Sequence, residues 1–124
     1  MLVRGIRGAI TVEEDSPEAI LAATRELLET ICAANPNLKL EDIASVLFTT
    51  TGDLHTAYPA QAARQLGWEM VPLMCAREID VPGGLPRCIR VLIHWNTDLP
   101  QAAVRPMYLR EAALLRPDLA QKPA

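Results

Sequence analysis

The sequence predicts an α+β domain in which two helices cover one face of a single β-sheet. Its 124 residues suffice for one domain with a modest core. Segments rich in β-branched residues alternate with two capped, amphipathic segments in the order β-α-β-α-β-β, followed by one ambiguous segment. Residues 88–95 alternate between an apolar face and a face that carries Arg90 and His94, so helices are expected on only one side of the sheet.

The first strand is expected at residues 2–12, LVRGIRGAITV. Side chains two residues apart point to the same side of a strand, so Arg7 shares a face with Gly5 and Ala9. These small neighbours leave a hollow above the sheet into which Arg7 could project. The alternative is an exposed edge strand with a solvated Arg7, because arginine is mostly exposed in proteins.

The first helix is expected from residue 17 to about residue 34. Ser16 precedes it as an N-cap, a proline occupies its first position, and Asn35 opens the Asn-Pro-Asn sequence that ends it. Ile20, Leu27 and Ile31 recur at helical spacing, and we expect this apolar stripe to face the sheet.

The middle of the chain is expected to contain two strands and a short helix. A helical turn is expected within residues 39–44, and the second strand at residues 45–51, SVLFTTT. The second helix, residues 59–66, starts at a proline and closes at Gly67. The third strand is expected at residues 68–76.

The last third of the chain contains the fourth strand and the ambiguous segment. A Gly/Pro-rich loop leads to the fourth strand at residues 88–95, and a helical turn is expected to begin at Pro100. Residues 108–115, YLREAALL, have helix propensity, but their alternation also allows a strand. The tail beyond Ala120 is expected to be mobile.

The sheet face that carries Arg7 and Arg90 has no helix of its own in this arrangement. A chain of this length usually covers such a face by oligomerising. We therefore expect any pocket on this face to lie between subunits.

Composition argues against several classes of protein. The three cysteines are an odd number without a CxxC motif, which disfavours a disulfide scaffold and a zinc site. A net charge of −3 provides no basic field for nucleic acid. No apolar run of about 20 residues could span a membrane, and no signal peptide is recognised, so a cytoplasmic protein without membrane or nucleic-acid partners is expected.

Residues 71–90, VPLMCAREIDVPGGLPRCIR, are the most unusual part of the sequence. They place Cys75, Glu78 and Arg90 around a Gly/Pro-rich turn with a strand on each side. Arg90 lies in an apolar strand, and a guanidinium cannot be neutralised to escape burial. It therefore requires an anionic partner, either from the protein or from a ligand.

Four further polar side chains are candidates for the same site: Arg7, Arg64, Tyr108 and Arg116. The candidates offer cationic donors, one acid and one phenol, but no nucleophile–base pair, because the sequence shows no histidine partner for Cys75. His55 has no second ligand at a suitable spacing and is assigned a loop-packing role. Such a set suits a small dicarboxylate, and it could stabilise charge that develops on an oxygen without acid–base or covalent steps.

Six motifs occur in order along the chain. They are RGIRGA at residues 4–9, DLHxxxPA at 53–60, VPLxC at 71–75 with Glu78, CIRVL at 88–92, NTDLPQ at 96–101, and YL at 108–109 followed by LRPDL at 115–119. Together they resemble the monofunctional chorismate mutase family of the AroH type. The resemblance implies a single domain over residues 1–119 and a flexible tail over residues 120–124.

The resemblance implies that the protein rearranges chorismate to prephenate, at the branch point toward phenylalanine and tyrosine, without a metal or other cofactor. It implies a bacillus chorismate mutase-like fold with a five-stranded mixed sheet, in which residues 108–115 form a strand. It also implies a homotrimer whose sheets enclose a pseudo-α/β barrel. The active sites would lie at the three subunit interfaces, in agreement with the uncovered sheet face.

The resemblance further implies roles for individual residues. Arg90 would contact the breaking ether oxygen and a carboxylate, Arg7 would hold a carboxylate, and Glu78 would accept a hydrogen bond from the ring hydroxyl. These three would be the catalytic residues. The substrate-binding residues would be Tyr108 and Cys75, then Tyr58, Ala60, Gln61 and Arg64 from the neighbouring subunit, and Leu115 and Arg116 from the C-terminal segment.

One position departs from the family pattern. Gln61 stands where some members carry lysine, so substrate would bind more weakly or Arg64 would carry more of the binding.

Two other functions compete with this interpretation. One is another trimeric enzyme with interface sites, such as an imine/enamine deaminase, whose signature motifs are not apparent. The other is a non-catalytic trimeric ligand-binding or regulatory module for an aromatic-pathway acid, which the presence of Arg90 disfavours.

Overall fold

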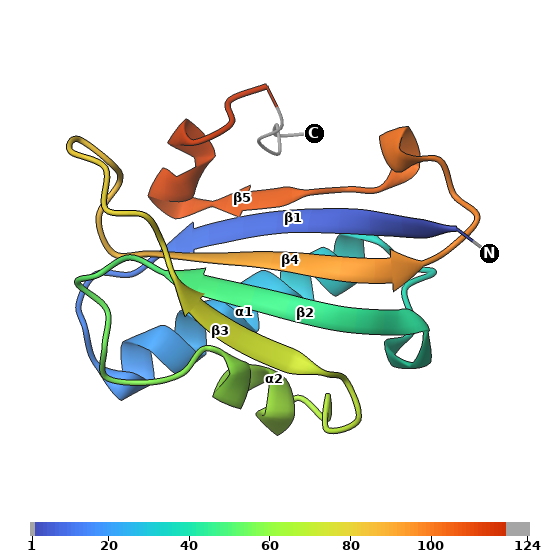
Figure 1. Cartoon of the computed structure of the whole chain (residues 1–124), viewed down its shortest axis with the longest axis horizontal. Helices are drawn as coiled ribbons and strands as arrows, with labels where there is room; N and C mark the ends of the chain where they lie inside the picture. Colours follow the sequence, from blue (N-terminus) through green and yellow to red (C-terminus); the bar gives the residue numbers. More distant parts are fainter. Residues whose placement is uncertain (1, 119–124) are drawn as a thin grey trace.

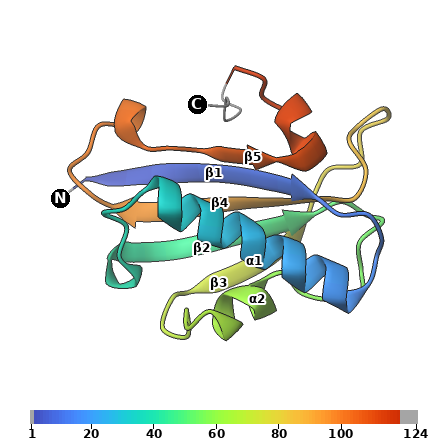
Figure 2. The ribbon, with the colours of Figure 1, turned by 180° about the vertical axis from the view of Figure 1, so that it is seen from behind.

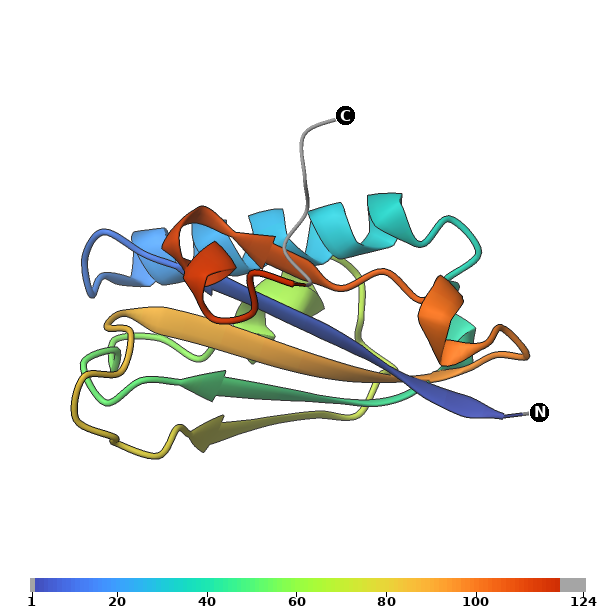
Figure 3. The same cartoon turned by 90° about the horizontal axis from the view of Figure 1, so that it is seen from above.

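The computed structural model describes residues 2–118, which fold into a helix layer and a sheet layer (Figures 1 to 3). Figure 2 shows both helices lying across one face of the sheet, and Figure 1 shows the other face open toward the viewer. The strands are β1 (Val3–Thr11), β2 (Ile43–Thr50), β3 (Leu73–Arg77), β4 (Cys88–Asn96) and β5 (Met107–Leu109). The helices are α1 (Pro17–Ala34) and α2 (Ala60–Gln65), with 3₁₀ turns η1 (Leu40–Asp42), η2 (Gln101–Ala103) and η3 (Arg110–Leu114).

Within the described residues the five strands form one mixed sheet in the order β3-β2-β4-β1-β5. β4 runs antiparallel to both of its neighbours, β1 and β2, whereas the outer pairs β1–β5 and β2–β3 are parallel. The predicted α+β fold, a five-stranded mixed sheet with helices on one face, is confirmed.

The core lies between α1 and the apolar face of the sheet. The helix begins as predicted, because the Ser16 side chain accepts a hydrogen bond from the Ala19 N–H at 3.1 Å. Its stripe is buried against the strands, and the β4 residues that alternate with Arg90 are buried on the same side. The apolar side chains of this layer include Ile20, Leu27, Ile31, Ile89, Val91, Ile93 and Trp95.

The chain between α2 and β3 differs from the prediction. The third strand was expected from residue 68, but it begins at Leu73. Trp68 donates its N–H to the Ala63 carbonyl at 3.0 Å, and Gly67 adopts a positive φ of 92°, so these residues cap the end of α2 instead of joining the sheet. Pro72 has no N–H for a ladder hydrogen bond, which places the start of β3 after it.

The segment over residues 108–115 is divided between two kinds of structure. β5 ends at Leu109, and Arg110, with a positive φ of 55°, begins the turn η3. The Arg110 guanidinium donates to the Thr11 carbonyl at 2.9 Å and pairs with Glu26 at 3.1 Å, which directs the chain away from β1. The strand predicted for the whole segment is therefore wrong beyond Leu109.

The predicted mobile tail over residues 120–124 lies outside the described residues. None of the helices in the described part of the chain is both long and apolar enough to cross a membrane.

Gly8 lies on β1 beneath α1 and has no room for a larger side chain. A Cβ at this position would lie 2.8 Å from the Cδ1 of Ile31 and 3.1 Å from the Cγ1 of Val91. We expect Gly8→Val to lower the free energy of unfolding by about 1–3 kcal/mol through overpacking, measured by guanidinium denaturation at fixed protein concentration. Gly52→Ala is the control, because nothing lies within 4 Å of its Cβ position. Equal stability of the two variants would contradict this close packing.

Candidate active site

Arg90 and Glu78 meet on the open face of the sheet. Arg90 lies opposite Thr49 of β2, and its neighbours Ile89 and Val91 are buried on the helix side, so alternation directs Arg90 to the open side. Glu78 follows β3 and accepts a hydrogen bond from the Thr49 hydroxyl at 2.6 Å. Its Oε1 lies 3.6 Å from the Nε of Arg90. Glu78 is thus the anionic partner that the sequence required for Arg90.

This ion pair is loose. The 3.6 Å separation exceeds the 2.7–2.9 Å of a close charge-assisted hydrogen bond, and 44% of the Arg90 side chain is exposed. Glu78 is held more firmly by Thr49 than by Arg90. Much of the guanidinium therefore remains accessible to an anionic ligand.

A cavity of about 460 Å³ surrounds this pair, and we call it the arginine cavity. It is lined by residues from β1, β2, β4, β5 and the two segments that follow β3 and η3. Six of the predicted site residues line it: Arg7, Glu78, Arg90, Tyr108, Leu115 and Arg116. Three guanidinium groups around one carboxylate make the cavity suited to a ligand with more than one negative charge.

A small apolar cluster on the open face supports one end of this cavity. Tyr108 pairs with Ala9 across β5 and β1 and is buried together with Cys88 and Ala112, and Leu115 packs against them. Burial raises the pKa of the Cys88 thiol, so it serves here as a small apolar side chain. The turn η3 thus carries the C-terminal site residues back over the sheet.

Arg116 already binds a carboxylate. Its Nε lies 3.2 Å from Oδ1 of Asp118 and its Nη2 lies 2.9 Å from Oδ2, in the paired geometry typical of arginine and carboxylate. These hydrogen bonds lower the pKa of the Asp118 carboxyl. The Nε and Nη2 of Arg116 are therefore occupied by a carboxylate of the same chain at the rim of the arginine cavity.

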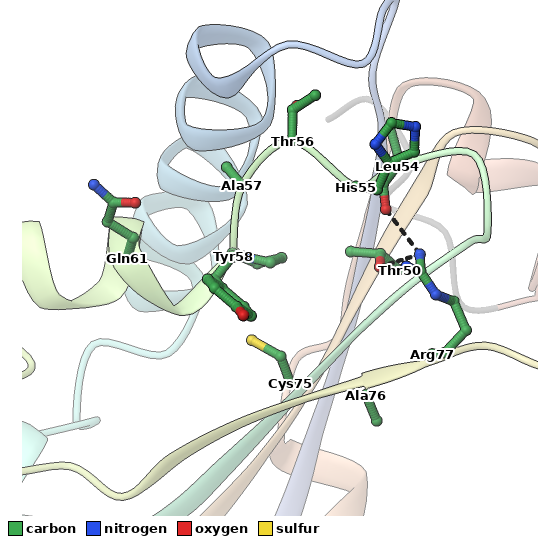
Figure 4. Close-up of a pocket in the computed structure, with 11 residues that line it drawn as sticks. Thr50, Leu54, His55, Thr56, Ala57, Tyr58, Gln61, Cys75, Ala76 and Arg77 are labelled. Carbon is green, nitrogen blue, oxygen red and sulfur yellow. Dashed lines mark hydrogen bonds between the residues drawn. The ribbon is translucent and has the colours of Figure 1, made fainter.

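A second cavity of about 510 Å³, which we call the tyrosine cavity, opens beside α2 (Figure 4). Tyr58, Gln61 and Cys75 line it, and Figure 4 shows the Cys75 sulfur directed toward the side where Tyr58 lies. Cys75 lies opposite the buried Phe48 of β2, so it faces the helix side of the sheet. Within one chain, Cys75 therefore does not lie with Glu78 and Arg90, contrary to the expectation from the sequence.

The remaining predicted residues lie on α2. Ala60 is buried at the start of the helix, and Gln61 one residue later lines the tyrosine cavity. Arg64 is exposed on the next turn and lines neither of these two cavities. The predicted residues that line a cavity thus form two groups, one in each cavity, and Ala60 and Arg64 line neither.

Two residues that the sequence did not single out hold the loop of the tyrosine cavity. Arg77 donates to the Thr51 and Leu54 carbonyls at 2.8 and 2.7 Å, and Figure 4 draws its bond to Leu54. Asp15 accepts from the Thr56 hydroxyl at 2.8 Å and lies 3.2 Å from the His55 ring. Neither contact has a local pattern that could reveal it, because each joins segments that are distant in sequence.

No three His, Cys, Asp or Glu side chains within residues 2–118 are grouped in a way that could hold a metal ion. The polar side chains that line the two cavities carry guanidinium, carboxylate, phenol, thiol, amide, imidazole and hydroxyl groups.

Comparison with known proteins identifies the family. The family model for chorismate mutase type I matches residues 3–119. The chain belongs to the chorismate mutase type I family. It is accordingly a chorismate mutase, an isomerase, and the family and activity predicted from the sequence are confirmed.

Named relatives of this chorismate mutase match almost its full length. It is 64% identical over 118 residues to Chorismate mutase AroH of Thermus thermophilus, covering 95% of this chain and 97% of the relative. It is 50% identical over 120 residues to Chorismate mutase AroH of Bacillus subtilis, covering 96% and 94%. Its fold matches the solved structure of a chorismate mutase from Clostridium thermocellum with a TM-score of 0.86 at 45% identity, covering 89% of this chain and 97% of that one.

Thr49 was missed by the sequence interpretation, although it orients Glu78. We expect Thr49→Val to lower kcat/KM for chorismate about tenfold, because the carboxylate loses its 2.6 Å hydrogen bond. Thr49→Ser, which keeps the hydroxyl, should stay within about threefold of the wild type. Both are measured by the loss of chorismate ultraviolet absorbance. Equal losses in the two variants would show that the hydroxyl has no such role.

Proposed function

We propose that this chorismate mutase converts chorismate to prephenate by electrostatic stabilisation of the transition state, with Arg90, Glu78 and Arg7 as its catalytic residues. The observation that carries the proposal is the arginine cavity, in which three guanidinium groups and one carboxylate surround the same space. The set contains no nucleophile with an adjacent base, so binding and charge stabilisation are the chemistry that it offers.

The reaction is an intramolecular rearrangement in which a C–O bond breaks as a C–C bond forms. No proton needs to be transferred, but negative charge develops on the ether oxygen as its bond to carbon lengthens. A fixed guanidinium at this oxygen interacts more strongly with the transition state than with the substrate, and only such differential binding raises kcat. Arg90 has this role in the proposal, and its loose pairing with Glu78 leaves it accessible to the oxygen.

The other residues of the arginine cavity orient the substrate. Arg7 and Tyr108 hold carboxylate groups, and Arg116 closes over the ligand together with Leu115. Glu78 accepts a hydrogen bond from the ring hydroxyl of chorismate. The hydrogen bond from Thr49 holds the Glu78 carboxylate in place for this contact. Holding the reacting atoms close together in the right geometry also raises the rate of the reaction.

We further propose that the active enzyme is a homotrimer with its active sites at the subunit interfaces. Two observations support this: the open sheet face has no cover within the described chain, and nine of the eleven predicted site residues are divided between two cavities. Tyr58, whose relative exposure is 70%, presents a large apolar surface beside the second cavity. In the trimer, the tyrosine cavity of one subunit completes the arginine cavity of the next.

This arrangement assigns the second group of residues to the neighbouring subunit. They are Tyr58, Ala60, Gln61, Arg64 and, differently from the sequence-based assignment, Cys75. Gln61 supplies no positive charge, so Arg64 carries more of the substrate binding than it would beside a lysine. The proposal places the enzyme in the cytoplasm, on the route to phenylalanine and tyrosine, with no cofactor.

Replacement of Arg90 tests the mechanism most simply. We expect Arg90→Ala to lower kcat by at least about 10²–10³-fold, because an oxyanion-type donor is worth roughly 3–4 kcal/mol. Replacement by citrulline, which keeps the shape and most hydrogen-bond donors but removes the charge, should cause a loss of similar size. The metal-stripped proteins are compared by the loss of chorismate absorbance, with prephenate identified as the product.

Sedimentation of the same variants controls for assembly, which Arg90→Ala should leave intact. A fully active citrulline variant would contradict a mechanism based on charge. A wild-type protein that binds chorismate without converting it would instead support the regulatory module.

A further inference from the structure

The loop that joins Glu78 to β4 projects beyond the end of the sheet (Figure 1). Its last residue, Arg87, has a φ of 48°, in the left-handed region that residues with a Cβ rarely adopt. Arg90 lies three residues further along the same chain. The conformation of Arg87 therefore determines how the strand that carries Arg90 begins.

The carboxylate of Asp53 holds the amide side of Arg87. It accepts a hydrogen bond from the Arg87 backbone N–H, with distances of 2.9 Å to Oδ2 and 3.2 Å to Oδ1. It also accepts from the Thr51 hydroxyl at 2.6 Å, and the same Thr51 oxygen accepts from the Cys88 N–H at 3.0 Å. Two successive N–H groups at the start of β4 are thus bonded to Asp53 and Thr51.

Contacts with the end of β1 hold the other side of Arg87. The Val12 N–H donates to the Arg87 carbonyl at 2.9 Å, and the Arg87 Nε donates to the Val12 carbonyl at 3.1 Å. With both sides held, β4 continues in the register that places Arg90 opposite Thr49.

On the side of Arg90 that faces the loop, few side chains pack against it. A cavity of about 620 Å³ lies there, lined by Asp53, Glu78 and Arg90 together with the loop itself. Side chains in a filled core are held by their neighbours, and those beside open space are not. On this side the position of Arg90 therefore depends on its backbone, which pairing with β1 and β2 holds along β4 and the anchors at Arg87 hold at the start of the strand.

We propose that Asp53 is a positioning residue for Arg90, acting through its hydrogen bond to the Arg87 backbone. It keeps Arg87 in the left-handed conformation and so sets the position of the Arg90 guanidinium relative to Glu78. This inference rests on the role proposed for Arg90. It gives a function to the first residue of the DLHxxxPA motif, which the proposed mechanism does not use.

Four variants of the full-length enzyme test the proposal. Asp53→Ala should lower kcat about tenfold to a hundredfold with a smaller change in KM, because a displaced guanidinium loses most in the transition state. Asp53→Asn keeps an acceptor oxygen and should stay within about threefold of the wild type. Thr51→Val, which removes the second anchor, should lower kcat severalfold. Arg87→Gly added to Asp53→Ala should recover at least about fivefold in kcat, because glycine adopts the left-handed conformation without an anchor.

Thermal unfolding of each variant separates positioning from a general structural role. A lowered melting temperature with an unchanged kcat in Asp53→Ala would overturn the proposal. So would equal losses in Asp53→Ala and Asp53→Asn, which would indicate a role of the charge, or a failure of Arg87→Gly to restore activity. If Asp53→Ala does not fold, Thr51→Val with and without Arg87→Gly provides the same comparison. Wild-type kcat in Asp53→Ala beside an inactive Arg90→Ala would refute this inference alone, whereas an active Arg90→Ala would refute the role of Arg90 itself.

Discussion

The alternation of β4 is the constraint on which the rest of the structure depends. Its apolar side chains fill the core beneath α1, and the strand is hydrogen-bonded on both edges, to β1 and to β2. A shift of one residue would turn these side chains to the open face and drive Arg90 into the core. Because a guanidinium stays charged, that alternative is strongly disfavoured. The hydrophobic core therefore determines where the arginine cavity forms.

The two faces of the sheet have separate tasks. The helix side supplies stability through a continuous apolar core, while the open side carries charged groups that a buried interior would not tolerate. Glu78 illustrates the balance, since Thr49 holds it firmly while its bond to Arg90 stays long. A tighter pair would satisfy both charges within the protein and leave less of the guanidinium for a substrate.

The sequence predicted best those elements whose signals are local. The Ser16 cap, the stripe of α1 and the alternation of β4 each depend on residues close in the chain, and all three agree with the structure. The sequence of β4 alone also predicted that Arg90 pairs with an anion, because a charge among apolar residues needs a partner.

Other features depend on contacts between distant segments and could not be predicted. β5 ends early because Arg110 bonds to Thr11 and Glu26, which lie far away in the sequence. The position of Cys75 on the helix side depends on the parallel register of β3 with β2, which the spacing of Cys75 from Glu78 does not reveal. The hydrogen bond from Thr49 to Glu78 depends on the same pairing.

Subunit complementation tests most directly the claim that two half-sites on different subunits make one active site. Arg90→Ala removes the arginine half, and the double variant Tyr58→Ala with Arg64→Ala removes the other half, while each leaves the second half intact. The two chains are produced together so that mixed oligomers form. If each site combines halves from adjacent subunits at random, about a quarter of the sites are complete, and activity should return to about a quarter of the wild-type value. Mixed oligomers that remain as inactive as either parent would contradict the account.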